Sequence, residues 1–184
     1  PTVGLPWSPA EQLPDELRDT VMRGRHIVEV VSEPAWREGA GEVFSGLPTG
    51  PRGLARIQPL AAGLVDDRVR AIDLSIRAID AWRAGFDWVA VDMPPDPIQA
   101  VPGPPIELAA WRQVSQKLSG RRFVTDVPLA GDVRAILADG LRGAVLIAWS
   151  DLAEGSTEVV ADLGNSAVVA TDLWGRTSKI GLTQ

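Results

Sequence analysis

The chain has 184 residues, with 18 Lys and Arg against 24 Asp and Glu and a formal net charge of −6 at pH 7. This acidic balance argues against nucleic-acid binding, which needs a clustered basic surface, and no apolar run reaches the roughly 18 residues that span a bilayer. The chain has no Cys and one His, which excludes disulfides, zinc–thiolate centres, Cys nucleophiles and metal sites built on a His pair of this chain.

The first third of the chain predicts few regular elements. Residues 1–24 predict a short helical region, because the letters SPAE at residues 8–11 have the form of a capping box. Residues 25–31 are β-branched and apolar, which predicts a strand. Residues 38–64 are rich in Gly and Pro and predict a long loop, with a short strand at Leu54–Ile57.

The clearest predicted element is a helix from about Asp66 to Ala84, which turns at Gly85 into a strand from Phe86 to Val91. The strand ends at Asp92, and together these elements are typical of an α/β fold. The apolar positions of the helix are predicted to face the core: Ile72, Ile76, Ile79 and Trp82. The charged positions are predicted to lie on the other side, with Asp73 and Arg77 as an i,i+4 pair: Arg70, Asp73, Arg77 and Asp80.

The pattern changes class near residue 120. Residues 93–105 are rich in Pro and predict a stiff surface connection, and a second helix is predicted from about Pro105 to Leu118. Short, mostly β-branched segments then recur with turns between them, which is typical of an antiparallel sandwich. These segments are 123–129, 133–139, 143–150, 157–163, 167–173 and 177–182. The predicted fold is therefore α/β units over residues 1–119, followed by an antiparallel β-sandwich over residues 120–184.

Three motifs follow one another along the chain: AWRAGFD at residues 81–87, AWSD at 148–151 and TDLWGR at 171–176. In this order they resemble the C-terminal part of TIM-barrel glycoside-hydrolase-like proteins, in which the last βα units of the barrel precede a small β-sandwich. The resemblance covers about Val65 to Ile180. A complete barrel takes about 250 residues, so the α/β units form either part of a TIM-barrel-like structure or a smaller α/β layer.

The resemblance also implies candidate catalytic carboxylates. It makes residues 25–34 the seventh barrel strand, with Glu33 as nucleophile or transition-state stabiliser at its end, and it makes Asp92 a substrate-contacting carboxylate on the eighth. Glycoside hydrolysis uses two such carboxylates, and a chain this poor in His and Cys must rely on them. The alternatives are that Glu33 is a solvated strand-end residue and that Asp92 caps the turn before Pro94.

Seven Trp residues and no Tyr raise the question of sugar stacking. Helix and strand patterns place most of the indoles in the core. Trp36 and Trp7, which are predicted in irregular segments, are the candidate ligand-binding platforms.

These observations predict the C-terminal segment of a glycoside-hydrolase-like, carbohydrate-related protein. The usual acid/base Glu lies on the fourth barrel strand, which this chain lacks, so we expect no turnover by the isolated chain. Since the chain opens with Pro1 rather than Met, we expect an upstream segment or a protein partner to complete it. One alternative is a non-catalytic accessory or interaction module, and another is a structural subunit with residues 93–105 as a docking arm. We expect neither a metal nor a cofactor.

Overall fold

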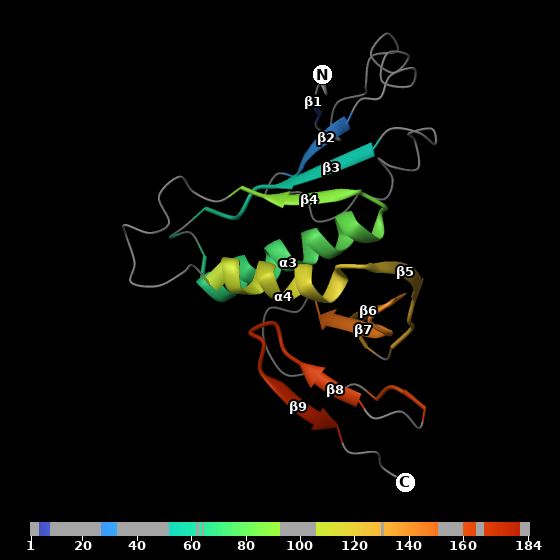
Figure 1. The fold of residues 1–184 in the computed structure, drawn as a ribbon. Coiled ribbons are helices and arrows are strands. Elements are labelled where there is room, and N and C mark those ends of the chain that lie inside the picture. The colour runs from blue at the N-terminus through green and yellow to red at the C-terminus, as the bar shows by residue number, and fades with distance from the viewer. Residues whose placement is uncertain are drawn as a thin grey trace. The chain divides into compact units, whose positions relative to one another are not determined.

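The computed structural model describes residues 4–7, 27–32, 52–61, 63, 65–92, 106–129, 131–150, 160–164 and 168–180 (Figure 1). The chain divides into two compact units, Pro1–Glu107 and Leu108–Gln184. The division falls in the first turn of the second predicted helix, earlier in the chain than the predicted boundary near residue 120.

The first unit contains a four-stranded parallel sheet. Its strands are β1 (Gly4–Trp7), β2 (Ile27–Ser32), β3 (Arg52–Ile57) and β4 (Trp88–Val91). They lie side by side in the order β1-β2-β3-β4, and every neighbouring pair is parallel. An α/β class is thus confirmed for this unit, and its described strands form an open sheet rather than a closed barrel.

The strands of the sheet correct three predictions. Residues 38–64 were predicted as a loop with a short strand, but β3 is a six-residue strand with a neighbour on each side. Residues 25–34 and 86–92 were predicted to be successive strands, but β3 lies between β2 and β4. Residues 4–7, predicted within a helical region, form β1. A short strand is hard to predict in a Gly- and Pro-rich stretch, because a strand needs only a few extended residues to pair with its neighbours in a sheet.

Helix α3 (Asp67–Arg83) connects β3 to β4 and contacts both strands (Figure 1). Asp66 caps its first turn, where the Asp66 carboxylate accepts a hydrogen bond of 2.8 Å from the Arg68 N–H. The buried residues of β3, Gly53, Ala55 and Ile57, alternate with half-exposed ones, so one face of the sheet is buried and α3 packs there.

The orientation of α3 differs in part from the predicted one: Ile79 is buried as predicted, but Ile72 is not. Ile72 is 41% exposed, whereas Asp73 and Arg77 are each only 3% exposed, so the pair predicted on the solvent side is buried. The predicted i,i+4 contact between Asp73 and Arg77 is confirmed. The helix turns a row of mostly small residues inward, because small side chains let a helix approach a sheet closely: Ala71, Leu74, Ala78 and Ala81.

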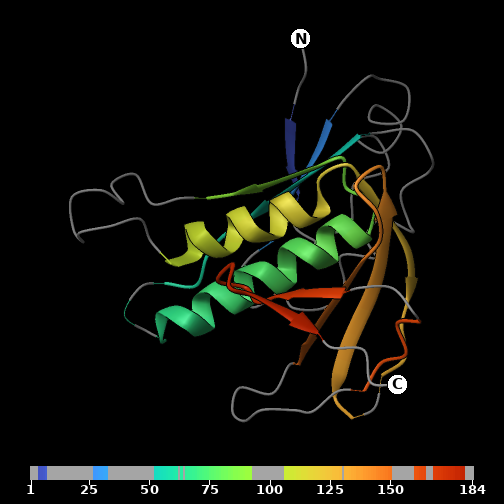
Figure 2. The ribbon, with the colours of Figure 1, turned by 60° about the horizontal axis from the view of Figure 1, so that its bottom comes forward.

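The second unit contains most of α4 (Ile106–Leu118) and two antiparallel sheets (Figure 2). One sheet has the order β5 (Arg121–Asp126), β6 (Val133–Gly140) and β7 (Val145–Ser150). The other is a hairpin of β8 (Val168–Thr171) and β9 (Thr177–Ile180). Antiparallel β structure is confirmed here. The predicted segment 157–163 is not a strand over its described residues 160–163.

Candidate functional site

The carboxyl ends of the parallel strands are the natural place to look for a site, because ligands of α/β proteins bind at this edge. The register brings Ser32, Ile57 and Val91 into one row across the sheet, which is the last row of each strand. The next residues in the sequence are Glu33, Gln58 and Asp92, so polar side chains follow three neighbouring strands.

Asp92 is held by two contacts with β3. Its backbone N–H donates to the Ile57 carbonyl at 2.9 Å, and its Oδ2 lies 3.1 Å from Nε of Arg56. Arg56 and Asp92 occupy the same face of the sheet, since Arg56 pairs with Ala90, two residues before Asp92. Each of the two side chains is 40% exposed, so the carboxylate is oriented by a guanidinium and still open to solvent. Such a group can accept hydrogen bonds from hydroxyl donors.

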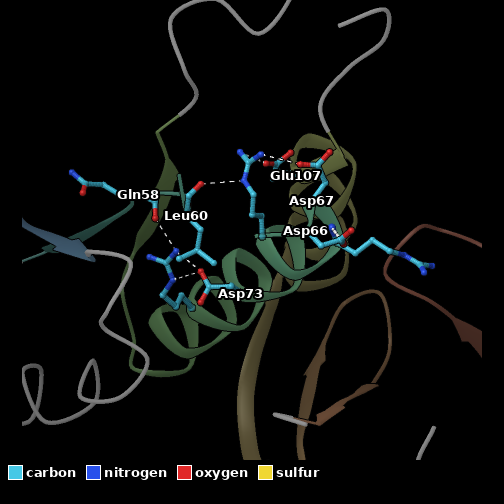
Figure 3. A network of polar contacts seen from close by, with 9 residues as sticks. Gln58, Leu60, Asp66, Asp67, Asp73 and Glu107 are labelled. Atoms are coloured by element: carbon cyan, nitrogen blue, oxygen red, sulfur yellow. Dashed lines mark hydrogen bonds and ion pairs between the residues drawn. The ribbon is translucent and has the colours of Figure 1, made fainter. Parts of the chain in front are cut away.

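A buried ion pair fixes the segment that follows β3 (Figure 3). Arg77 Nε donates to Asp73 Oδ2 at 3.0 Å, and both side chains are 2% exposed. Arg77 also donates from Nη2 to the backbone carbonyl of Gln58 at 2.7 Å. In Figure 3, dashed lines join both the Gln58 carbonyl and the Asp73 carboxylate to one guanidinium, and the Gln58 side chain points away from Asp73. Helix α3 therefore holds the first residue after β3 through a charged donor.

A second arginine, one heptad earlier on α3, holds the same segment further along. Arg70 Nε donates to the Leu60 carbonyl at 3.1 Å, and its Nη1 lies 3.1 Å from Asp67 Oδ1. Its Nη2 pairs with Glu107, whose side chain is 5% exposed (Figure 3). Arg70 and Arg77 together tie residues 58 and 60 to α3, which gives this connection a defined path.

The sequence placed these arginines and Asp73 on a solvated surface and so missed them. A signal was available in the small residues of α3: Ala71, Leu74, Ala78 and Ala81 recur at i,i+3 and i,i+4 spacing. Had that row been taken as the buried face, Arg70 and Arg77 would have been expected beside it.

The predicted site residues are only partly within the described structure. Asp92 is at the carboxyl edge as predicted, although the turn that it was proposed to cap lies outside the described residues. Glu33 and Trp36 also lie outside the described residues, and both stay predictions. Trp7 is the last residue of β1 rather than part of an irregular segment.

The motif AWRAGFD ends helix α3. The Gly85 N–H donates to the Trp82 carbonyl at 3.0 Å and the Phe86 N–H to the Ala81 carbonyl at 3.3 Å, with φ of Gly85 at 93°. These are the two bonds of a Schellman motif, which needs a residue with positive φ. Asp87 then accepts a hydrogen bond of 3.2 Å from the Gly53 N–H, and so joins the start of β4 to β3.

The motif TDLWGR forms the turn between β8 and β9. Asp172 Oδ1 accepts hydrogen bonds from the N–H groups of Trp174, at 3.0 Å, and Arg176, at 2.8 Å. Its Oδ2 lies 2.6 Å from Nε of Arg176, and Gly175 has φ of 84°. Asp172, Gly175 and Arg176 of the motif therefore serve the geometry of a short hairpin.

Among the described residues, Asp172 has a perturbed pKa. Desolvation acts to raise the pKa of this carboxyl, but the hydrogen bonds from Arg176 and Trp174 and the positive charge of Arg176 outweigh it. The net effect holds the pKa of Asp172 below its ordinary value of 3.8.

The motif AWSD contributes a cross-strand pair to the second unit. Trp149 on β7 is the register partner of Arg134 on β6, and the Arg134 guanidinium carbon lies 5.1 Å from the centre of the indole ring. This is a cation–π contact on one face of an antiparallel ladder. All three motifs that carry the resemblance therefore have structural roles.

Within the described part of the chain, no cluster of three His, Cys, Asp or Glu side chains could hold a metal ion. No helix among the described residues is both long and apolar enough to cross a membrane. No protein-family model, curated protein or solved structure matches the chain.

Proposed function

We propose that this chain is the C-terminal segment of a glycoside-hydrolase-like, carbohydrate-related protein, in which β1 to β4 belong to a TIM-barrel-like unit and residues 120–184 to a small β-sandwich. The observation that carries the proposal is the strand order. Four parallel strands lie side by side in sequence order, as successive strands do in a TIM barrel, whereas a doubly wound sheet reverses its order at a switch point.

The strand order also revises the numbering of the barrel. With β3 between β2 and β4, the strand before Glu33 becomes the sixth rather than the seventh. The residue after the seventh strand is then Gln58, a neutral amide that cannot act as a nucleophile. Strand position therefore no longer supports a nucleophilic role for Glu33. We still propose Glu33, beside Asp92, as the second carboxylate at the carboxyl edge of the parallel sheet.

The spacing of the strands bears on the chemistry. Strands lie about 4.8 Å apart, so the ends of β2 and β4 are separated by roughly 10 Å. Carboxylates that hydrolyse with inversion lie about 6.5–9.5 Å apart, and retaining pairs only about 5–5.5 Å apart. This spacing is wider than a retaining pair needs, so we propose a substrate-binding role for Asp92 rather than a nucleophilic one, and we expect no turnover by the isolated chain.

Sugar binding is the direct test of this proposal. The chain is titrated with cello-, xylo-, malto- and chito-oligosaccharides while its amide NMR signals are recorded, and we expect shifts at Asp92 and its neighbours. Asp92→Asn keeps the shape of the side chain and removes the charge, so affinity should fall about tenfold, as for loss of a hydrogen bond to a charged group. Asp132→Asn changes an exposed aspartate of the second unit and should leave binding unchanged.

The same titration separates the proposed site from the accessory-module alternative. That alternative is favoured by the structural roles of the AWSD and TDLWGR motifs, which stabilise strands and turns of the second unit. Sugar-induced shifts confined to Trp149 and Trp174 would support an accessory module. If the folded chain binds none of these oligosaccharides, a carbohydrate site at the edge of the parallel sheet is refuted.

A further inference from the structure

We infer that Arg77 is a positioning residue for Asp92 and acts through the carboxyl end of β3. Three consecutive residues of this strand end carry the coupling: Arg56 and Ile57 hold Asp92, and Gln58 is held by Arg77. The inference rests on the proposed function only for the role of Asp92 in binding. The contacts that it uses all lie within the chain and involve no ligand.

The buried pair is suited to setting a position rather than to adding stability. The Arg77 guanidinium is planar, and its Nε is tied to Asp73 Oδ2 one helical turn away, which leaves it few orientations. In that orientation Nη2 meets the Gln58 carbonyl at 2.7 Å. Apolar side chains of similar size in these places would usually give as stable a fold, but they could not hold a backbone carbonyl.

The strand end transmits this restraint to Asp92 in two ways. Gln58 directly follows Ile57, whose carbonyl accepts the hydrogen bond from the Asp92 N–H. The residue before Ile57 is Arg56, whose Nε forms an ion pair with the Asp92 carboxylate at 3.1 Å. Both contacts depend on the backbone path of residues 56–58. If that path loosens, the backbone and the carboxylate of Asp92 lose their supports together.

The test measures amide hydrogen exchange in the full chain without any ligand. Arg77→Lys keeps the charge, but one ammonium cannot reproduce the planar two-point geometry between Asp73 and the Gln58 carbonyl. Exchange of the Asp92 amide should become about tenfold faster or more, because a bond from a charged donor has been weakened near it. Amides in the middle of the sheet, at Ala55 and Val89, should change by less than about twofold. Arg68→Lys, the same substitution at an exposed position of α3, should leave all three unchanged.

Two results would overturn the inference. One is an Asp92 amide that exchanges in Arg77→Lys within about twofold of its rate in the unmodified chain, and the other is an equal acceleration of all sheet amides, which marks a general loss of stability. If Arg77→Lys does not fold, Asp73→Asn removes the charge that holds the guanidinium and must give the same local effect. Failure to bind sugars would refute the proposed function and leave this coupling intact, so the two failures are distinguishable.

Discussion

Replacing Arg77 with Met should strongly destabilise the first unit. Both side chains of the Asp73–Arg77 pair are 2% exposed, so Arg77→Met leaves a carboxylate buried beside an apolar side chain. Breaking one side of a buried ion pair costs about 3–5 kcal/mol of the free energy of unfolding, and the Gln58 carbonyl loses a donor as well. The whole stability of a domain is roughly 5–15 kcal/mol, so the variant should fold but unfold at a much lower urea concentration.

The double variant Asp73→Leu/Arg77→Met removes both charges and provides the internal control. Replacing a buried pair with apolar side chains is often neutral, so only the lost bond to Gln58 should remain, at about 0.5–1.5 kcal/mol. Urea unfolding is followed at NMR signals of α3, so that the first unit is measured separately from the second. The reasoning is refuted if Arg77→Met costs less than about 1 kcal/mol, as a surface pair would, or if the double variant is as unstable as the single one.

Two further predictions concern the second unit. The pKa of Asp172 is lowered in the folded chain, so its stabilising contribution is present above the ordinary value of 3.8 and is lost as the pH falls through the folded pKa. Cross-strand NOEs between β8 and β9 should weaken at that low pH, and Asp172→Asn should weaken them already at neutral pH; an unchanged hairpin in this variant would contradict the assignment. Gly140→Ala should destabilise the unit by about 1–3 kcal/mol, because its Cβ would meet the Gly120 carbonyl oxygen at 2.2 Å. Gly143→Ala is the control, because nothing lies within 4 Å of the added Cβ and only the positive φ of 82° opposes the change. Comparing the thermal unfolding of the two variants separates the effect of the clash from that of backbone strain.

Local signals in the sequence predicted individual elements well. Asp66 and Gly85 bracket the predicted helix, and α3 runs from Asp67 to Arg83 between them. Strand β4 and helix α4 also lie within their predicted ranges. These elements are recognised because caps, positive-φ glycines and apolar runs act over a few residues.

Sheet order was beyond the same signals, and the orientation of α3 was predicted from only some of them. The neighbours of β3 lie 25 residues or more away in sequence at paired positions such as Ile27 and Arg52, and no local pattern records which strands meet. The orientation of α3 was predicted from its isoleucines, since these are the most apolar side chains. Close packing against a sheet placed the alanines and Leu74 inward together with Ile79, left Ile72 exposed and buried Asp73 and Arg77 as well.

The charges at the carboxyl edge bear on the kind of ligand that would suit it. Three arginines lie on β3 or on α3 beside the segment that follows β3, and together they face four carboxylates: Arg56 faces Asp92, Arg70 faces Asp67 and Glu107, and Arg77 faces Asp73. A phosphate site needs uncompensated positive charge or a row of backbone N–H groups, and these guanidinium groups are already balanced by carboxylates. An edge that is polar, without excess positive charge and partly open at Asp92 is compatible with a neutral ligand rich in hydroxyl groups. The contacts of β3, a strand concealed in a Gly- and Pro-rich stretch, thus support the carbohydrate proposal more directly than the motifs that first suggested it.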